Sequence, residues 1–303
     1  MSDLLVNPPS DREPLQASFS DAANPLGLDG VEFIEYATPK PQALGQVLEM
    51  MGFKPVARHR SREVLLYRQG GLNIVVNAHP ADAAANSSGA PTISAIALRV
   101  RDARAAFNFV CERGAWAVPT HAEVMELNIP AIHGAGGSRI YFVDRYKEFS
   151  IYDVDFIPIP SVDQRPAATA GLHFFGVVQY IGPERSYDWM EFYSALFGMQ
   201  IIPDEQRFGI MPKGKLLRSP ELAPGSSFML QLIEPEVNVL DSEESLQRIG
   251  LGVPDVLDAV QALRRLGVEF VETVKTHTEQ RGAISKTYLG SVVFELVHSE
   301  TQS

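Results

Sequence analysis

The sequence lacks the features that define several protein classes. Its 303 residues include one cysteine, Cys111, which excludes a disulfide within the chain and the disulfide framework of small secreted proteins. No apolar run approaches the length that crosses a membrane, and residues 1–25 lack the basic and apolar segments of a signal peptide. Because a lone thiol suits a reducing compartment, we expect a cytoplasmic protein.

Positive charge is also scarce. The chain has 26 lysines and arginines against 37 aspartates and glutamates, and its formal net charge is -11. A surface of this sign repels nucleic acids and anionic membranes, so neither is expected as a partner. The hydrophobic fraction of 45% is ordinary for a soluble globular protein, and the length suits two domains with a core each.

The two halves of the chain repeat the same pattern. Residues 41–56 and residues 186–202 each predict a helix that ends at a glycine and is followed by a strand. Residues 94–118 and residues 247–271 each predict a strand, an amphipathic helix, a glycine and a second strand. A repeat of this length indicates a duplicated domain rather than a solenoid, with two strand-helix-strand-strand-strand modules in each half.

The ends of the two halves are similar as well. Residues 138–156 resemble residues 285–299, and each is expected to form a hairpin of two alternating strands. Residues 157–171, which are rich in proline and small residues, predict a linker. We therefore expect a first domain over residues 27–160 and a second over residues 171–299. By composition, residues 1–26 are expected to be disordered.

Three long blocks of the first half carry a family resemblance. Residues 24–39 (NPLGLDGVEFIEYATP), residues 51–77 and residues 125–146 closely resemble the amino-terminal domain of bacterial 4-hydroxyphenylpyruvate dioxygenases, and residues 150–158 continue the match. The resemblance implies an α+β fold of two vicinal oxygen chelate domains. Each domain would consist of two βαβββ modules that form a cupped mixed sheet. It also implies that the first domain holds no metal and that the chemistry belongs to the second.

That family holds Fe(II) with two histidines and a glutamate, which leaves coordination positions open for a 2-oxo acid and dioxygen. The resemblance places His173 and Glu295 at two of these positions, as candidate metal ligands for Fe(II) or another divalent metal. Arg248 stands where the second histidine is expected. The three equivalent positions of the first domain have no strong side-chain donor for a metal: they are Gly30, Ala95 and Ser150.

Arg248 changes what the second domain can do. A guanidinium is always charged near neutrality and has no free lone pair, so it cannot replace an imidazole as a ligand. We expect it to occupy the place of the metal, within hydrogen-bond distance of Glu295 and near His173. An inward arginine is suited to binding a carboxylate, which makes Arg248 a candidate ligand-binding residue. Ser219 and Gln231 are further candidates, in the segment where the resemblance places the family's polar substrate contacts. The sequence assigns no catalytic residue.

Two functions remain open from the sequence. In the first, a 4-hydroxyphenylpyruvate dioxygenase-like protein acts on or binds a small aromatic or 2-oxo acid, with any metal held by His173 and Glu295 alone. In the second, the chain is a metal-free ligand-binding or accessory protein without oxygenase activity. Structural roles are the alternatives for the same residues: a histidine bonded within the sheet, and a buried Arg248–Glu295 ion pair. Members of this family often associate through exposed sheet edges, so a homo-oligomer is expected.

Overall fold

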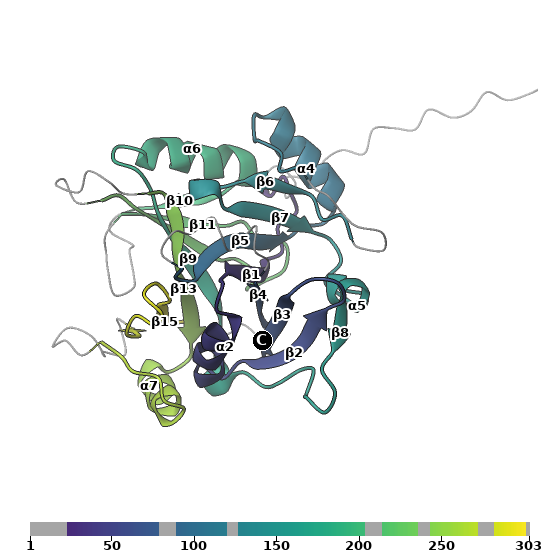
Figure 1. The fold of residues 1–303 in the computed structure, drawn as a ribbon. Coiled ribbons are helices and arrows are strands. Elements are labelled where there is room, and N and C mark those ends of the chain that lie inside the picture. The colour runs from purple at the N-terminus through teal and green to yellow at the C-terminus, as the bar shows by residue number, and fades with distance from the viewer. Residues whose placement is uncertain are drawn as a thin grey trace, which may run out of the picture.

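The computed structural model describes residues 23–78, 89–119, 127–203, 214–235, 243–271 and 282–300. Its strands form one continuous mixed sheet of 15 strands with helices packed around it (Figure 1). The first half comprises β1 (Val31–Ala37), α2 (Pro41–Met50), β2 (Lys54–His59), β3 (Val64–Gln69), β4 (Leu72–Asn77), β5 (Thr92–Arg99), α4 (Ala103–Glu112), β6 (Ala131–His133), η1 (Ala135–Gly137), β7 (Arg139–Val143), α5 (Ile151–Asp155) and β8 (Phe156–Pro158).

The second half repeats this order. It comprises η2 (Thr169–Gly171), β9 (His173–Tyr180), α6 (Ser186–Phe197), β10 (Gln200–Ile202), β11 (Lys215–Arg218), β12 (Met229–Ile233), β13 (Ser245–Val253), α7 (Val256–Arg265), β14 (Ala283–Ile284) and β15 (Phe294–His298). The fold class is therefore the expected α+β arrangement, with two modules in each half.

Strand pairing follows the same plan in both halves. In the first, β1 lies antiparallel to β5 and parallel to β4, and β5 lies parallel to β7. In the second, β9 lies antiparallel to β13 and parallel to β12, and β13 lies parallel to β15. The halves join where Leu246 of β13 pairs with Ile93 of β5, which makes the two sheets continuous.

Local sequence signals set the helix ends. Asp102 caps α4 and Asp255 caps α7, and each side chain accepts a hydrogen bond from the backbone N–H three residues later, at 2.8 and 2.9 Å. At the other end, Gly52 follows α2 with a φ of 92° and Gly198 follows α6 with a φ of 69°. Both helices therefore stop at the predicted glycines, because a left-handed φ favours a residue without a Cβ.

Two apolar clusters fill the molecule. The larger packs the helices against the sheet, with α4 and α6 on one side of the view and α2 and α7 on the other (Figure 1). The smaller lies on the concave face of the first half, where Ile151, Tyr152 and Phe156 from α5 and β8 pack against Phe33 and Ala97 of the sheet. The cup of the first half is thus filled by the chain's own side chains.

The expected hairpin over residues 138–156 is wrong in its second strand. Residues 151–155 form α5, because Ser150 and Asp153 make a capping box in which the Ser150 backbone N–H donates to Asp153 Oδ2 at 2.7 Å. In the second half the antiparallel pair is β14 with β15, and its counterpart is β6 with β7. The expected hairpin over residues 285–299 is also wrong, because these residues hold only β15 and its antiparallel partner β14 lies before them.

Residues 23–26, the last part of the segment expected to be disordered, are packed against the rest of the chain. Residues 1–22 lie outside the described part of the chain, but Asn24 and Leu26 are only 6% and 3% exposed. The predicted linker is also anchored, since Gly70 N–H donates to Pro166 O at 2.7 Å. The division into domains at residues 160 and 171 stays a prediction. Within the described residues, no helix is long and apolar enough to cross a membrane.

Candidate functional site

The candidate site lies on the face of β13 that carries Arg248, Gly250 and Gly252. On one side, Gly250 pairs with Glu295 of β15. On the other, Gly252 pairs with His173 of β9, whose ring covers the space that a Gly252 side chain would need: a Cβ there would be 2.2 Å from His173 Nε2. The sheet therefore places all three residues expected from the sequence around Gly250, on one face.

Arg248 and Glu295 form a buried ion pair. Arg248 Nε donates to Glu295 Oε2 at 3.0 Å, and the two residues are 4% and 5% exposed. This is the contact expected from the sequence. Arg248 Nη2 is also buried, and it has no hydrogen-bond partner in the described structure. Buried donors are almost always paired, so a free cationic N–H is a position at which a further acceptor is to be sought.

His173 is oriented by contacts with η2 and with the residue that follows β15. Its Nδ1 lies 3.1 Å from Gly171 O and its Nε2 lies 3.1 Å from Ser299 Oγ. A carbonyl oxygen only accepts, so Nδ1 carries the proton and, in the neutral ring, Nε2 accepts from the Ser299 hydroxyl. This is the tautomer that metal-binding histidines commonly use, because a backbone acceptor on one nitrogen leaves the other nitrogen with its lone pair.

Phe175 is a site residue that the sequence did not reveal. The pairing of β9 with β13 shifts register between Gly250 and Leu251, and Phe175 is the extra residue of the bulge there. Its Cδ1 lies 3.6 Å from where a Cβ on Gly250 would stand. The aromatic ring therefore covers the glycine that the three candidate residues surround. Bulges have no reliable signature in a single sequence, which is why alternation alone missed this contact.

A small cavity of about 30 Å³ lies beside the ion pair. Glu295, Gln231 and Val178 are among its lining residues, and Val178 pairs with both Gln231 and Arg248 across the three strands. A volume of this size holds one or two water molecules, or the oxygens of one carboxylate. The candidate Gln231 thus lies in the same row of the sheet as Arg248.

Ser219, the other ligand-binding candidate, is engaged by the backbone. It is 3% exposed, and its hydroxyl accepts from Phe228 N at 2.9 Å, which extends the pairing of β11 with β12. Glu234, which follows β12, caps the first residue of α6. The Ser186 hydroxyl and backbone N–H donate to its carboxylate, which holds the pKa of Glu234 below its ordinary value.

The residues around Gly250 do not fit a resident Fe(II). An Fe(II) site of the expected kind needs three protein donors, whereas His173 and Glu295 are the only two among these residues. Glu295 already accepts from Arg248 at 3.0 Å, and the guanidinium charge would oppose a divalent cation at that carboxylate. In the part of the chain that the structure describes, no group of three or more His, Cys, Asp or Glu residues is placed to hold a metal ion.

The register of the strand pairing also identifies the first-half residues that correspond to His173, Arg248 and Glu295. Arg99 N donates to Gly30 O at 2.9 Å, so Gly30 faces β5 as His173 faces β13. Ala95 occupies the position of Arg248 in the repeated strand, as expected. Ser150 was expected at the position that corresponds to Glu295, and this is wrong because Ser150 caps α5. The residue at that position is Tyr141, which pairs with Ala97 of β5 in the way that Glu295 pairs with Gly250 of β13. None of Gly30, Ala95 and Tyr141 is a ligand that Fe(II) prefers.

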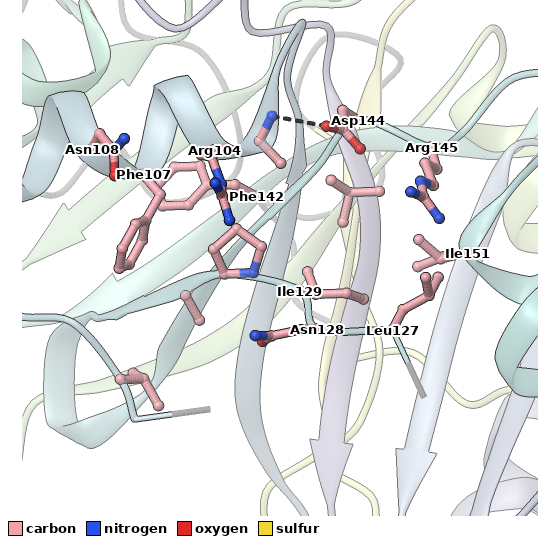
Figure 2. Close-up of a pocket in the computed structure, with 15 residues that line it drawn as sticks. Arg104, Phe107, Asn108, Leu127, Asn128, Ile129, Phe142, Asp144, Arg145 and Ile151 are labelled. Atoms are coloured by element: carbon pink, nitrogen blue, oxygen red, sulfur yellow. Dashed lines mark hydrogen bonds between the residues drawn. The ribbon is translucent and has the colours of Figure 1, made fainter. Parts of the chain in front are cut away.

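A larger pocket of about 580 Å³ lies in the first half (Figure 2). It is bounded by the first turns of α4, by the end of β7 and by residues 127–131, and its lining includes Phe107, Ile129, Arg104 and Arg145. No sequence motif indicated it, because its three walls are far apart along the chain.

Comparisons with known proteins agree with the geometry of the fold. A family model described as hydroxyphenylpyruvate dioxygenase, HPPD, N-terminal matches residues 22–157. The hemolysin VllY of Vibrio vulnificus is 36% identical over 277 residues, 86% of this chain and 76% of that protein. A 4-hydroxyphenylpyruvate dioxygenase of Pseudomonas aeruginosa is 34% identical over 274 residues, 85% of this chain and 75% of that one.

A solved structure supports the fold. It is a xylose isomerase-like TIM barrel/4-hydroxyphenylpyruvate dioxygenase fusion protein, which aligns with a TM-score of 0.70 at 23% identity. The alignment covers 92% of this chain and 50% of the fusion. At that level of identity the match concerns the arrangement of strands and helices, and the site must be argued from the residues themselves.

Proposed function

The chain belongs to the 4-hydroxyphenylpyruvate dioxygenase family, and within that family we propose that it binds a small aromatic or 2-oxo acid beside Arg248, without Fe(II)-dependent oxygenase chemistry. The family is Fe(II)-dependent, and iron supplies its oxygen chemistry where the full ligand set is present. Here a guanidinium is paired with the one carboxylate of that set. The protein's function would then be recognition of the acid.

The observation that supports this proposal most directly is the free Nη2 of Arg248. It is a buried donor on a cation, and Glu295, the ion-pair partner of Arg248, lines a small cavity together with Gln231. Hydrogen bonds from a charged donor to a carboxylate are about twice as strong as neutral ones. Glu295 balances the charge of Arg248, so the acid would gain one charge-assisted hydrogen bond rather than a full ion pair. We therefore expect the protein to prefer ligands with a carboxylate and to bind them with modest affinity.

A pair of ligands and one conservative variant test the proposal. Wild-type protein should bind 4-hydroxyphenylpyruvate more tightly than 4-hydroxyphenylacetone, which keeps the ring and the ketone but lacks the carboxylate. Arg248→Lys should keep a cation beside Glu295, and hence the fold, while losing the planar fork of donors. We expect this variant to bind the acid at least about tenfold more weakly, the worth of one charge-assisted hydrogen bond, as measured by isothermal titration calorimetry.

The control is binding of the ketone, which Arg248→Lys should leave unchanged. If both proteins bind the acid with equal affinity, or if wild type binds acid and ketone equally, Arg248 does not recognise a carboxylate and the proposal fails. Loss of fold would show as a changed melting temperature of the variant without ligand, so that outcome is separable from loss of binding.

A further inference from the structure

The pocket of the first half has a chemistry of its own. Its lining is mixed: Phe107 from α4, Ile129 from the segment before β6 and Phe142 from β7 supply apolar surface, and arginine and asparagine side chains supply polar surface. Its volume of about 580 Å³ falls within the range of small-molecule sites, whereas the cavity beside Arg248 is about 30 Å³. The apolar cluster that fills the first half's cup ends at this pocket, since Ile151 belongs to both.

Two arginines border the pocket. Figure 2 shows Arg104 extending from α4 and Arg145 from the end of β7, both toward the segment that carries Asn128 and Ile129. Neither guanidinium forms an ion pair or a hydrogen bond within the described part of the chain. Asp144, the carboxylate among the lining residues, accepts from the backbone N–H of Ala103 through Oδ2 at 3.1 Å. In a chain of net charge -11, two arginines against one aspartate give the described lining of this pocket a positive balance.

We propose that this pocket is a second binding site, for a small amphipathic carboxylate whose apolar body lies against Phe107 and Ile129 and whose acid group contacts Arg104 and Arg145. Apolar walls with a few convergent polar groups are what small-molecule sites have in common. Arginine recognises carboxylates through its planar fork of donors, and the amides of Asn108 and Asn128 offer further hydrogen bonds at the rim. The site is independent of Arg248 and of the function proposed for the second half.

The test uses 2-naphthoate and its neutral counterpart 2-naphthamide as probes, titrated into the full-length protein by calorimetry. Wild type should bind the carboxylate more tightly than the amide. Arg104→Gln and Arg145→Gln should each weaken carboxylate binding by about threefold to tenfold, a charge-assisted hydrogen bond discounted for solvent exposure. Both residues are exposed, so the fold should be unaffected.

Two controls locate the binding. Arg113→Gln removes the same charge from the end of α4, outside the pocket, and should leave the affinity within about twofold of wild type because solvent screens distant charges. Arg248→Lys should also leave it unchanged. Equal affinities in wild type, Arg104→Gln and Arg145→Gln would overturn the proposal, as would loss of binding in Arg248→Lys alone, which would place the probe in the second half.

Discussion

Arg248→Met is expected to destabilise the protein by about 3 to 5 kcal/mol, the cost of breaking a buried ion pair from one side. Glu295 is 5% exposed, and its Oε2 accepts from Arg248 Nε at 3.0 Å. Removing the cation would leave a buried carboxylate without its partner. Urea unfolding followed by circular dichroism measures the change in the free energy of unfolding at a pH near neutrality.

A double variant separates the lost pair from lost packing. Arg248→Met combined with Glu295→Leu removes both charges, and replacing a buried pair by apolar residues is often neutral or stabilising. The double variant should therefore recover most of the stability lost by Arg248→Met. A single variant within about 1 kcal/mol of wild type would contradict the account, because an unpaired buried carboxylate costs more than that.

Arg248→His is expected to give the protein a site for Fe(II). The introduced imidazole would stand two residues before Gly250, with Glu295 and His173 at the two remaining positions around that glycine. His173 already has the tautomer that leaves Nε2 its lone pair, given its contact with Gly171 O. Two imidazoles and one carboxylate form the facial set that Fe(II) accepts. Anaerobic loading followed by metal analysis should give close to one iron per chain.

Arg248→Gln is the matched control, since it removes the charge without supplying an imidazole. Phe175 covers Gly250, so Arg248→His with Phe175→Ala should be measured alongside. If neither histidine variant holds more iron than Arg248→Gln, the three positions do not converge as the register indicates. The interpretation of this face as a changed metal centre would then be wrong.

The parts of the structure that the sequence could predict have local or repeated causes. The duplication is visible because both halves repeat one order of strands and helices, and helices α2 and α6 end at glycines with left-handed φ. The Arg248–Glu295 pair was predictable because strands alternate their faces, so the parity of each residue and the family resemblance placed both side chains in the cup. Neither the duplication nor this ion pair required knowledge of other contacts between distant segments.

The parts that sequence analysis missed depend on small shifts or on distant segments. Residues 151–155 alternate between apolar and polar side chains, which suggests a strand. The capping box of Ser150 and Asp153 begins a helix there instead. That capping signal was present in the sequence, but the prediction gave more weight to the alternation. Phe175 reaches Gly250 only because a bulge adds a residue to β9. The pocket between α4 and β7 joins segments far apart in the sequence, as the separation of 41 positions between Ala103 and Asp144 illustrates.

The most direct test of the central claim is Fe(II) binding by the wild-type protein, titrated without oxygen, with oxygen uptake then followed on 4-hydroxyphenylpyruvate. The account predicts that iron stays well below one per chain and that the acid binds without oxygen being consumed, because Arg248 is paired with Glu295 on the face where the metal would lie. One tightly bound iron per chain, together with oxygen uptake that depends on 4-hydroxyphenylpyruvate, would contradict it.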